Sequence, residues 1–378
     1  MSDQAKPLRR ARRATDPPPT ANELTIPTLD AVLAYLAKTG ASDLHISAGI
    51  RPTARINGDL APVPGTSVLT ADASEQLVLG MMAEDQRAKF DREMELDFAF
   101  GRRALGRYRV NAFRERGDVS AALRRIPDQA PSLEELGMPR IIGTFAHLQQ
   151  GLVLVTGPSG SGKSATLAAI IDKVNKERNV HVITIEDPVE YLHPHDQAIV
   201  QQREVGKDTT DFARALRSAL REDPDVILIG EMRDLETISA AVSAAETGHL
   251  IFGTLHTNSA AGAIDRIIDA FPAHQQTQIR LQVAGSLQAV VSQRLLPLRR
   301  GGRVAVAEVL IANPAVRNLV REGKTHQLDS VMQSGIKDGM VIFDMRLAEL
   351  VRERLVSQEV AMNYCMDPRS FSERLLVK

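Results

Sequence analysis

The run GLVLVTGPSGSGKS at residues 151–164 constrains the chain more than any other stretch of it. It joins an apolar, strand-like segment directly to the pattern G-x-x-x-x-G-K-[ST]. The glycines of such a loop let successive backbone N–H groups turn inward around a phosphate, and a helix that begins at the end of the loop adds the partial positive charge of its N-terminus. Apolar residues recur at helical spacing between Leu167 and Val174, so this helix is predicted as well.

The loop predicts a nucleotide-binding site with Mg²⁺. We expect the Lys163 ammonium to reach the β- and γ-phosphates, and the Ser164 hydroxyl to bind Mg²⁺. The residues expected to contact the nucleotide through the loop are Gly157, Pro158, Ser159, Gly160, Ser161, Gly162, Lys163, Ser164 and Ala165. Strand, loop and helix follow one another as this motif requires, which makes a chance glycine-rich turn the weaker interpretation.

Composition limits the remaining possibilities. The length of 378 residues suggests about two domains, and 43% hydrophobic residues are typical of a globular protein. The 46 Lys and Arg residues nearly balance the 47 Asp and Glu residues, so no overall field attracts nucleic acid or an acidic membrane. Cys365 is the only cysteine, which excludes a disulfide framework and a multi-cysteine zinc site.

The sequence also predicts a cytoplasmic location. A single cysteine suits a reducing compartment. No apolar run approaches the roughly 18 residues of a membrane span, and the N-terminus has no secretory apolar region. Any membrane contact is therefore expected to be peripheral.

Two domains with flanking segments are predicted. Residues 1–22 form a basic, proline-rich tail with too few large apolar side chains to fold, and residues 23–127 form a small mixed α/β domain. A linker is expected at residues 128–140, a second α/β domain at residues 141–345 and a C-terminal helical segment at residues 346–378. Two interpretations of the tail stay open, a solvated segment or a contact with anionic lipid or an acidic partner.

Hydrophobic periodicity predicts the elements of both domains. In the first domain we expect helices at residues 29–36 and 75–90 and strands at residues 52–56, 96–100, 107–113 and 120–126. In the second we expect strands at residues 152–155, 180–185, 226–229 and 250–255, with helices at residues 211–221 and 234–246. Such strand-then-helix repeats favour a parallel, buried sheet. After Pro272 the chain is predicted to be mainly helical, apart from a strand at residues 303–311.

Polar residues follow the predicted strands of the second domain, at the sheet edge where ligands collect in open α/β folds. Three carboxylates follow the second strand, namely Glu186, Asp187 and Glu190, and one of them is expected to orient or deprotonate an attacking water. Glu231 follows the third strand in the Walker B position and is expected to hold Mg²⁺ through water. His249 and His256 flank the fourth strand. Taken singly, such residues are often helix caps or structural histidines, but their convergence on one loop favours a site.

These motifs together resemble the PilT family of secretion-type motor ATPases, which retract type IV pili. The matching segments in the second domain are the phosphate loop at residues 157–164, TIEDPVE at 184–190, LREDPDVILIGEMRD at 220–234, AETGH at 245–249, TLHT at 254–257 and AVRNLVRE at 315–322. In the first domain ASDLH at 41–45 and RYRVNAF at 107–113 match. The chain departs from the family pattern at Ala165, where threonine is common, in its basic proline-rich start and in its last 11 residues.

The resemblance implies an α/β fold with a RecA-like P-loop ATPase core, a smaller N-terminal mixed α/β domain that is PAS-like, and C-terminal helices. It implies ATP with Mg²⁺ as cofactor and a homo-hexamer in which the N-terminal domain packs on the neighbouring core. Glu190 would be the general base or water-positioning residue, and Glu231 the metal-associated one.

Four further site residues have roles implied by the resemblance. His249 and His256 would sense the γ-phosphate or the subunit interface. Arg109 and Arg124 would reach the phosphates of a neighbouring subunit from the N-terminal domain, although exposed strand charge is the alternative for both. The implied partners are an inner-membrane platform protein of the pilus and possibly a second retraction ATPase, with the chain peripherally associated with the cytoplasmic face of the inner membrane.

Four functions are therefore compared. The first is a motor that couples ATP hydrolysis to pilus disassembly, which the retraction-type segment at residues 315–322 favours. The second is an accessory retraction ATPase that needs a partner motor. The third is a nucleotide-gated scaffold with little turnover, against which Lys163, Glu190 and Glu231 argue. The fourth, a nucleic-acid translocase, has no support from a near-neutral chain with 4% aromatic residues.

Overall fold

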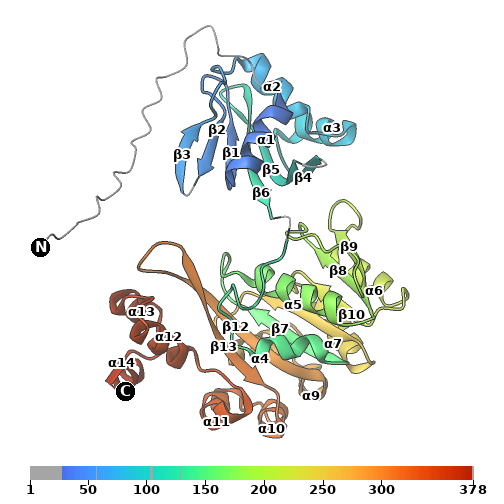
Figure 1. Ribbon diagram of the computed structural model, residues 1–378. Coiled ribbons are helices and arrows are strands. Elements are labelled where there is room, and N and C mark those ends of the chain that lie inside the picture. The colour runs from blue at the N-terminus through green and yellow to red at the C-terminus, as the bar shows by residue number, and fades with distance from the viewer. Residues whose placement is uncertain (1–27, 57, 103–104, 128, 377–378) are drawn as a thin grey trace, which may run out of the picture. The chain divides into compact units, whose positions relative to one another are not determined.

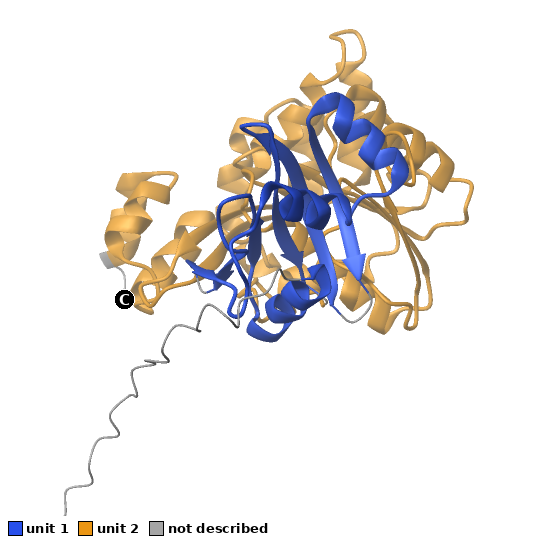
Figure 2. Cartoon of the chain, turned by 90° about the horizontal axis from the view of Figure 1, so that it is seen from above, with its two compact units in different colours: residues 1–127 blue, residues 128–378 orange. Residues whose placement is uncertain are grey.

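The chain forms two compact units, residues 1–127 and residues 128–378 (Figure 2). The computed structural model describes residues 28–56, 58–102, 105–127 and 129–376 (Figure 1). The tail predicted at residues 1–22 lies outside the described residues.

The N-terminal unit contains a six-stranded antiparallel sheet in the order β3-β2-β1-β6-β5-β4. Its elements are α1 (Leu29–Thr39), β1 (Asp43–Ile46), β2 (Thr53–Ile56), β3 (Asp59–Pro62), α2 (Ala71–Leu79), α3 (Glu84–Glu93), β4 (Glu95–Arg102), β5 (Gly106–Glu115) and β6 (Asp118–Ile126). Buried helix residues such as Leu36, Val78 and Phe90 share one core with Leu44 and Val110 of the sheet. Because strand side chains alternate between faces, the opposite face of the sheet carries polar residues.

The prediction of one helix over residues 75–90 is wrong, because two helices occupy this stretch. Gly80 closes α2, and Gln86 Oε1 accepts the Ala83 N–H at the start of α3 (2.9 Å). Two buried methionines at residues 81–82 continue the apolar pattern across the break. Periodicity alone therefore does not reveal it.

The C-terminal unit contains a seven-stranded sheet in the order β13-β12-β7-β11-β10-β8-β9. Its strands are β7 (Gly151–Thr156), β8 (His181–Glu186), β9 (Ile199–Glu204), β10 (Val226–Ile229), β11 (Leu250–Leu255), β12 (Leu287–Pro297) and β13 (Arg303–Ile311). Only β13 runs antiparallel to its neighbour in this sheet. The parallel strands therefore end at one common edge.

Helices cover both faces of this sheet (Figure 1). They are α4 (Ile141–Thr144), α5 (Lys163–Glu177), α6 (Phe212–Ala219), α7 (Leu235–Glu246), α8 (Ala260–Asp269), α9 (Gln276–Ser286), α10 (Pro314–Arg321) and α11 (Leu328–Ser334), with short 3₁₀ turns η1 (Phe145–His147), η2 (Thr325–Gln327) and η3 (Ile336–Asp338). One core lies under α6 to α11 and the other under α4 and α5. The burial of both faces explains why the strands are continuous apolar runs.

The C-terminal helices form a third layer on the β12–β13 hairpin. They are α12 (Phe343–Arg352), α13 (Gln358–Tyr364) and α14 (Pro368–Leu376). Leu347 and Phe371 of these helices share a core with Leu296 and Val306 of the hairpin.

The four strands predicted for the second domain at residues 152–155, 180–185, 226–229 and 250–255 are confirmed, as is the strand predicted at residues 303–311. The expectation of a mainly helical chain after Pro272 is wrong at β12, which adds an 11-residue strand. Short apolar runs are compatible with either structure, and pairing with β7 and β13 decides for a strand here. The edge strand β9 was also not predicted.

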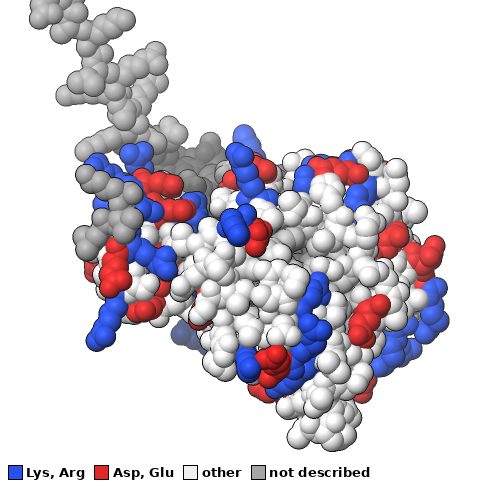
Figure 3. All heavy atoms as spheres, turned by 90° about the horizontal axis from the view of Figure 1, so that it is seen from below, with Lys and Arg blue, Asp and Glu red and all other residues white. Residues whose placement is uncertain are grey.

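Charged side chains are mixed on the surface. On the face shown in Figure 3, Lys and Arg lie in small groups beside Asp and Glu, separated by uncharged surface. In the part of the chain that the structure describes, no helix combines the length and the apolar character needed to cross a membrane.

Candidate active site

The phosphate loop lies between β7 and α5, where the sequence motif predicts it. Gly157, Gly160 and Gly162 have φ values of 142°, 74° and 90°, which a residue with a side chain rarely adopts. A Cβ atom on Gly157 would also lie 2.2 Å from the backbone oxygen of Gln293. The loop therefore needs its glycines, and α5 begins directly after it at Lys163.

Lys163 lies across the loop. Its Nζ donates to the carbonyl oxygens of Gly157 (2.8 Å) and Pro158 (3.2 Å). Burial lowers the pKa of this lysine, although the nearby charges of Glu231 and Glu190 favour its protonated form. The ammonium is thus close to both predicted catalytic carboxylates and to the loop that they face.

The hydroxyl groups of the loop fit a nucleotide with Mg²⁺. Ser161 Oγ and Thr166 Oγ1 are buried without a hydrogen-bond partner among the described residues. Ser164 is exposed in the first turn of α5, so its hydroxyl can bind Mg²⁺ together with the Glu231 carboxylate. Ala165 offers only its backbone in the same turn.

Glu186 is the last residue of β8 and binds the segment that carries the next predicted carboxylate, Glu190. Its Oε1 accepts hydrogen bonds from Thr184 Oγ1 (2.6 Å) and Gln202 Nε2 (3.2 Å), and its carboxylate also accepts the Glu190 backbone N–H. Burial is the largest effect on Glu186 and raises its pKa. Glu190 itself is exposed, so its side chain is available to a water or a substrate.

Glu231 and His256 meet at the ends of β10 and β11. His256 Nε2 lies 2.8 Å from Glu231 Oε1, and Arg233 Nε donates to the same oxygen. Burial opposes the ionisation of Glu231, but the hydrogen bond from Arg233 and the charges of His256 and Arg233 outweigh it and lower the pKa. The structure therefore brings these two predicted residues together beside Lys163.

His249 lies elsewhere in the sheet. It precedes β11, and its carbonyl oxygen accepts the Gly151 N–H at the start of β7 (2.9 Å). The phosphate loop follows the other end of β7, a six-residue strand of about 20 Å. His249 Nδ1 contacts the Ala244 carbonyl instead (3.1 Å). A contact between His249 and the phosphates of its own subunit is therefore not compatible with this position, because a histidine side chain cannot span that length.

Arg109 and Arg124 are cross-strand neighbours on the polar face of the N-terminal sheet. Arg124 Nε also lies 3.0 Å from Asp43 Oδ1, and Asp43 pairs with Arg55 on the next strand. Burial raises the pKa of Asp43, but hydrogen bonds from Ser42 and Arg124 outweigh it and hold the pKa below its usual range. Both predicted arginines are exposed, within a row that has more positive than negative charge.

Two glutamines at the site were not predicted. Gln202 on β9 links Glu186 to the Tyr191 carbonyl oxygen (2.8 Å), and Gln293 on β12 contacts the phosphate loop. Both lie on strands that sequence analysis missed. The run at residues 287–297 also contains Gln288, Ser292 and Arg294, so no sequence signal singles out Gln293.

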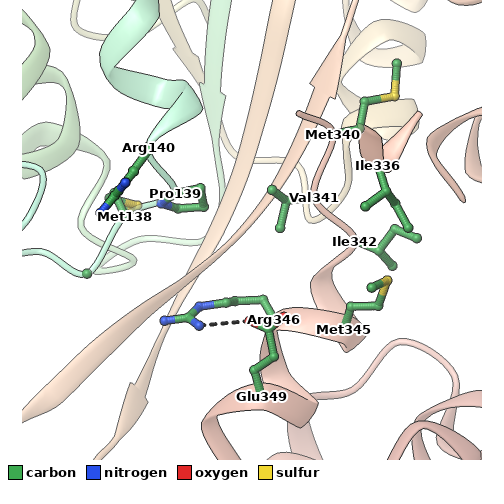
Figure 4. A pocket seen from close by; sticks show the side chains of 11 residues that line it. Met138, Pro139, Arg140, Ile336, Met340, Val341, Ile342, Met345, Arg346 and Glu349 are labelled. Atoms are coloured by element: carbon green, nitrogen blue, oxygen red, sulfur yellow. Dashed lines mark hydrogen bonds and ion pairs between the residues drawn. The ribbon is translucent and has the colours of Figure 1, made fainter. Parts of the chain in front are cut away.

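A separate cavity of about 440 Å³ lies in the C-terminal unit (Figure 4). Its lining is mostly apolar, with Met138, Met340 and Met345 among it, and Arg346 pairs there with Glu349 (2.9 Å). No phosphate-loop residue lines it. This cavity is therefore not part of the nucleotide site.

Comparison with known proteins, like the residues of the site, indicates an ATPase. A family model described as type II/IV secretion system protein matches residues 20–363. The chain is 48% identical over 340 residues to the type IV pilus retraction ATPase PilT of Pseudomonas aeruginosa, which covers 90% of this chain and 98% of that protein. It is 42% identical over 348 residues to the type IV pilus ATPase PilU of the same organism, covering 92% of this chain and 90% of that protein.

A solved structure is similar over nearly the whole length. A crystal structure of the pilus retraction motor PilT with bound ADP matches with a TM-score of 0.85 and 47% identity, and the match covers 91% of this chain and 98% of that one. The predicted fold class, a RecA-like core with a smaller N-terminal α/β domain, is confirmed by this similarity.

Proposed function

The chain belongs to the type II/IV secretion system protein family of ATPases, and we propose from this premise that it works as a homo-hexameric motor that hydrolyses ATP to retract type IV pili. The observation that carries the proposal is the convergence of Lys163, Glu190 and Glu231 at one sheet edge around a complete phosphate loop. The segment AVRNLVRE forms α10 and its C-cap, which supports retraction rather than assembly as the work performed.

The chemistry follows from the placement of these residues. The loop N–H groups and Lys163 bind the phosphates, and Glu190 orients the attacking water or accepts its proton. Bound Mg²⁺ neutralises phosphate charge, and Ser164 and Glu231 would hold it. His256 fixes the Glu231 carboxylate through their 2.8 Å contact.

Arg109 and Arg124 act in this proposal on the phosphates of a neighbouring subunit. Two like charges directly opposite each other destabilise a sheet, so an exposed arginine pair is better explained by an anionic ligand than by folding. Arginine residues supplied in this way raise phosphoryl-transfer rates by roughly 10³ to 10⁵. His249, which lies at the other end of β11, is assigned to the subunit interface.

The working parts and partners complete the proposal. The N-terminal domain spans residues 23–127, the linker 128–140, the ATPase domain 141–345 and the C-terminal segment 346–378. The hexamer acts peripherally at the cytoplasmic face of the inner membrane on a pilus platform protein. An accessory role beside a second retraction ATPase is the alternative function, and the 42% identity to PilU supports it less than the 48% identity to PilT supports the motor.

Steady-state ATPase activity with Mg²⁺, measured across protein concentration, tests the proposal. We expect turnover to rise with assembly and to be lost in Glu190→Ala and Arg124→Ala. Arg92→Ala is the matched control, because Arg92 is a 72% exposed arginine of the same N-terminal unit that pairs with the exposed Glu93. Binding of ATP without turnover in the parent protein would reject the motor and favour the partner-dependent function.

A further inference from the structure

Gln293 contacts the phosphate loop from the neighbouring strand. The β12–β7 register pairs Ser292 with Thr156, so Gln293 lies beside Gly157, the first residue of the loop. Its Nε2 donates to the Ser161 carbonyl oxygen (2.9 Å), and its side chain is completely buried. Bulk water therefore does not compete for this hydrogen bond.

Gln293 also packs against two glycines of the loop. The Gln293 backbone oxygen lies 2.2 Å from where a Cβ atom on Gly157 would be, and its Nε2 lies 3.3 Å from the corresponding position on Gly162. The loop thus packs on Gln293 at its beginning and at its end. A close backbone approach of this kind fixes the position of the loop relative to β12.

The hydrogen bond to the Ser161 carbonyl also determines which way the Ser161–Gly162 peptide faces. In a trans peptide the carbonyl oxygen and the following N–H point to opposite sides. A Ser161 carbonyl held by Gln293 therefore turns the Gly162 N–H away from the Gln293 side chain, and phosphate loops bind phosphates through such backbone N–H groups. The energetic effect on nucleotide arises through this peptide and not through contact of Gln293 with the nucleotide.

We infer that Gln293 is a positioning residue for phosphate binding, which orients the Ser161–Gly162 peptide toward the β-phosphate of the nucleotide. The inference needs only that the loop binds nucleotide phosphates. It does not depend on pilus retraction or on Arg109 and Arg124, so its failure is distinguishable from failure of the proposed function.

The test compares Gln293→Leu with Gln288→Leu in the full chain. Gln288 lies on the same strand, and its Nε2 donates to the Gln150 carbonyl oxygen (3.2 Å) at the other end of β7. Each substitution removes one side-chain hydrogen bond to a backbone carbonyl next to β7. The control differs because Gln288 is partly exposed and also accepts from Arg317 (3.3 Å).

Dissociation constants for ADP and AMP are measured by competition with a fluorescent ADP. We expect Gln293→Leu to weaken ADP binding about tenfold, which corresponds to about 1.4 kcal/mol of binding free energy. AMP binding should weaken less than twofold, because AMP has no β-phosphate. Gln288→Leu should change both less than twofold. ADP affinity within twofold of the parent in Gln293→Leu, or equal losses for ADP and AMP, would overturn the inference.

Folding is controlled in the same experiment. Circular dichroism and thermal unfolding establish that each variant is folded before binding is compared. If Gln293→Leu does not fold, Gln293→Met is measured in its place, because the flexible thioether fills a similar volume without a donor. The same tenfold loss of ADP affinity is expected, and unchanged affinity again rejects the inference.

Discussion

Two regions of the C-terminal unit each contain a largely buried glutamate, and the pKa values of these two glutamates shift in opposite directions. Beside the phosphate loop, the charged partners Arg233 and His256 lower the pKa of Glu231 despite its burial. Beside a cavity of about 300 Å³ under the C-terminal helices, Glu308 is 8% exposed, and burial raises its pKa to about 7. Charged partners thus favour the ionised form of Glu231, whereas burial holds Glu308 close to neutrality.

The partners explain the difference. Glu308 Oε1 accepts the Ala260 backbone N–H at the start of α8 (2.8 Å), which is fixed by the fold. Glu231 is bound by side chains, which can turn when a ligand arrives. Glu231 is thus held by charged side chains at the loop, whereas Glu308 is held by a backbone group of the fold. Substitutions in the two regions should therefore affect different quantities.

Removing the loop lysine should have the largest effect. We expect Lys163→Ala to lower kcat/KM for ATP by at least about 10³, because the phosphate charge loses its main protein cation. Lys176→Ala is the matched control, since Lys176 lies on the same helix and pairs with Asp172 at 2.7 Å. A loss below tenfold in Lys163→Ala would contradict the assigned role.

Glu190→Gln should lower kcat by roughly 10² to 10⁴, the range for a general base. ADP affinity should change less than about threefold, because the exposed Glu190 side chain is not part of the phosphate loop. Rapid-quench measurement of a single turnover checks the chemical step directly. If the loss is in ADP affinity and kcat is unchanged, Glu190 is a binding residue and not the base.

Glu308→Gln should stabilise the protein at pH 8 and leave kcat unchanged within twofold. The folded-state pKa of about 7 lies above the usual 4.5, so the stabilisation that the protonated form provides is complete below pH 4.5 and is lost as the pH rises through 7. The neutral amide removes this loss, which is of the order of 3 kcal/mol.

Thermal unfolding at pH 5 and pH 8 without nucleotide measures the effect. The parent should lose stability over this range, and the difference between parent and Glu308→Gln should grow from pH 5 to pH 8. Glu236→Gln, a change at a 70% exposed glutamate, is the control. An equal stability difference at both pH values would show that burial does not raise the pKa of Glu308.

Of these two regions, only the one beside the phosphate loop could be predicted from the sequence. The motif and the polar strand ends predict Lys163, Glu190, Glu231 and His256 at the loop, because each follows an apolar run in a parallel sheet. His249 precedes its strand, so in a parallel sheet its sequence position places it at the amino edge, away from the loop. Its prediction as a site residue rests on the family resemblance, and the structure places it at the opposite edge.

The other region was not predictable, because it depends on pairing that is remote in sequence. The pattern of β12 fits a helix or a strand, so the sequence does not predict the hairpin under the C-terminal helices, nor Gln293 at the phosphate loop. Glu308 follows the alternation of a strand, and its burial becomes visible only in the tertiary structure, where Ala260 of α8 binds it and Phe343 of α12 lines the same cavity. Its altered pKa is a property of tertiary structure.

Asp344 provides the smallest and most specific test of the comparison. Its two carboxylate oxygens accept the backbone N–H groups of Met366 (2.8 Å) and Asp367 (3.0 Å), and it is 5% exposed. Asp344→Asn keeps one acceptor, so we expect a loss of about 1 to 2 kcal/mol in stability, and Asp344→Ala should lose about 1 kcal/mol more. Thermal unfolding should show this order while ATPase activity stays within twofold. A tenfold loss of activity in a folded Asp344→Asn protein would instead connect the C-terminal region to the phosphate loop and end the separation of the two regions.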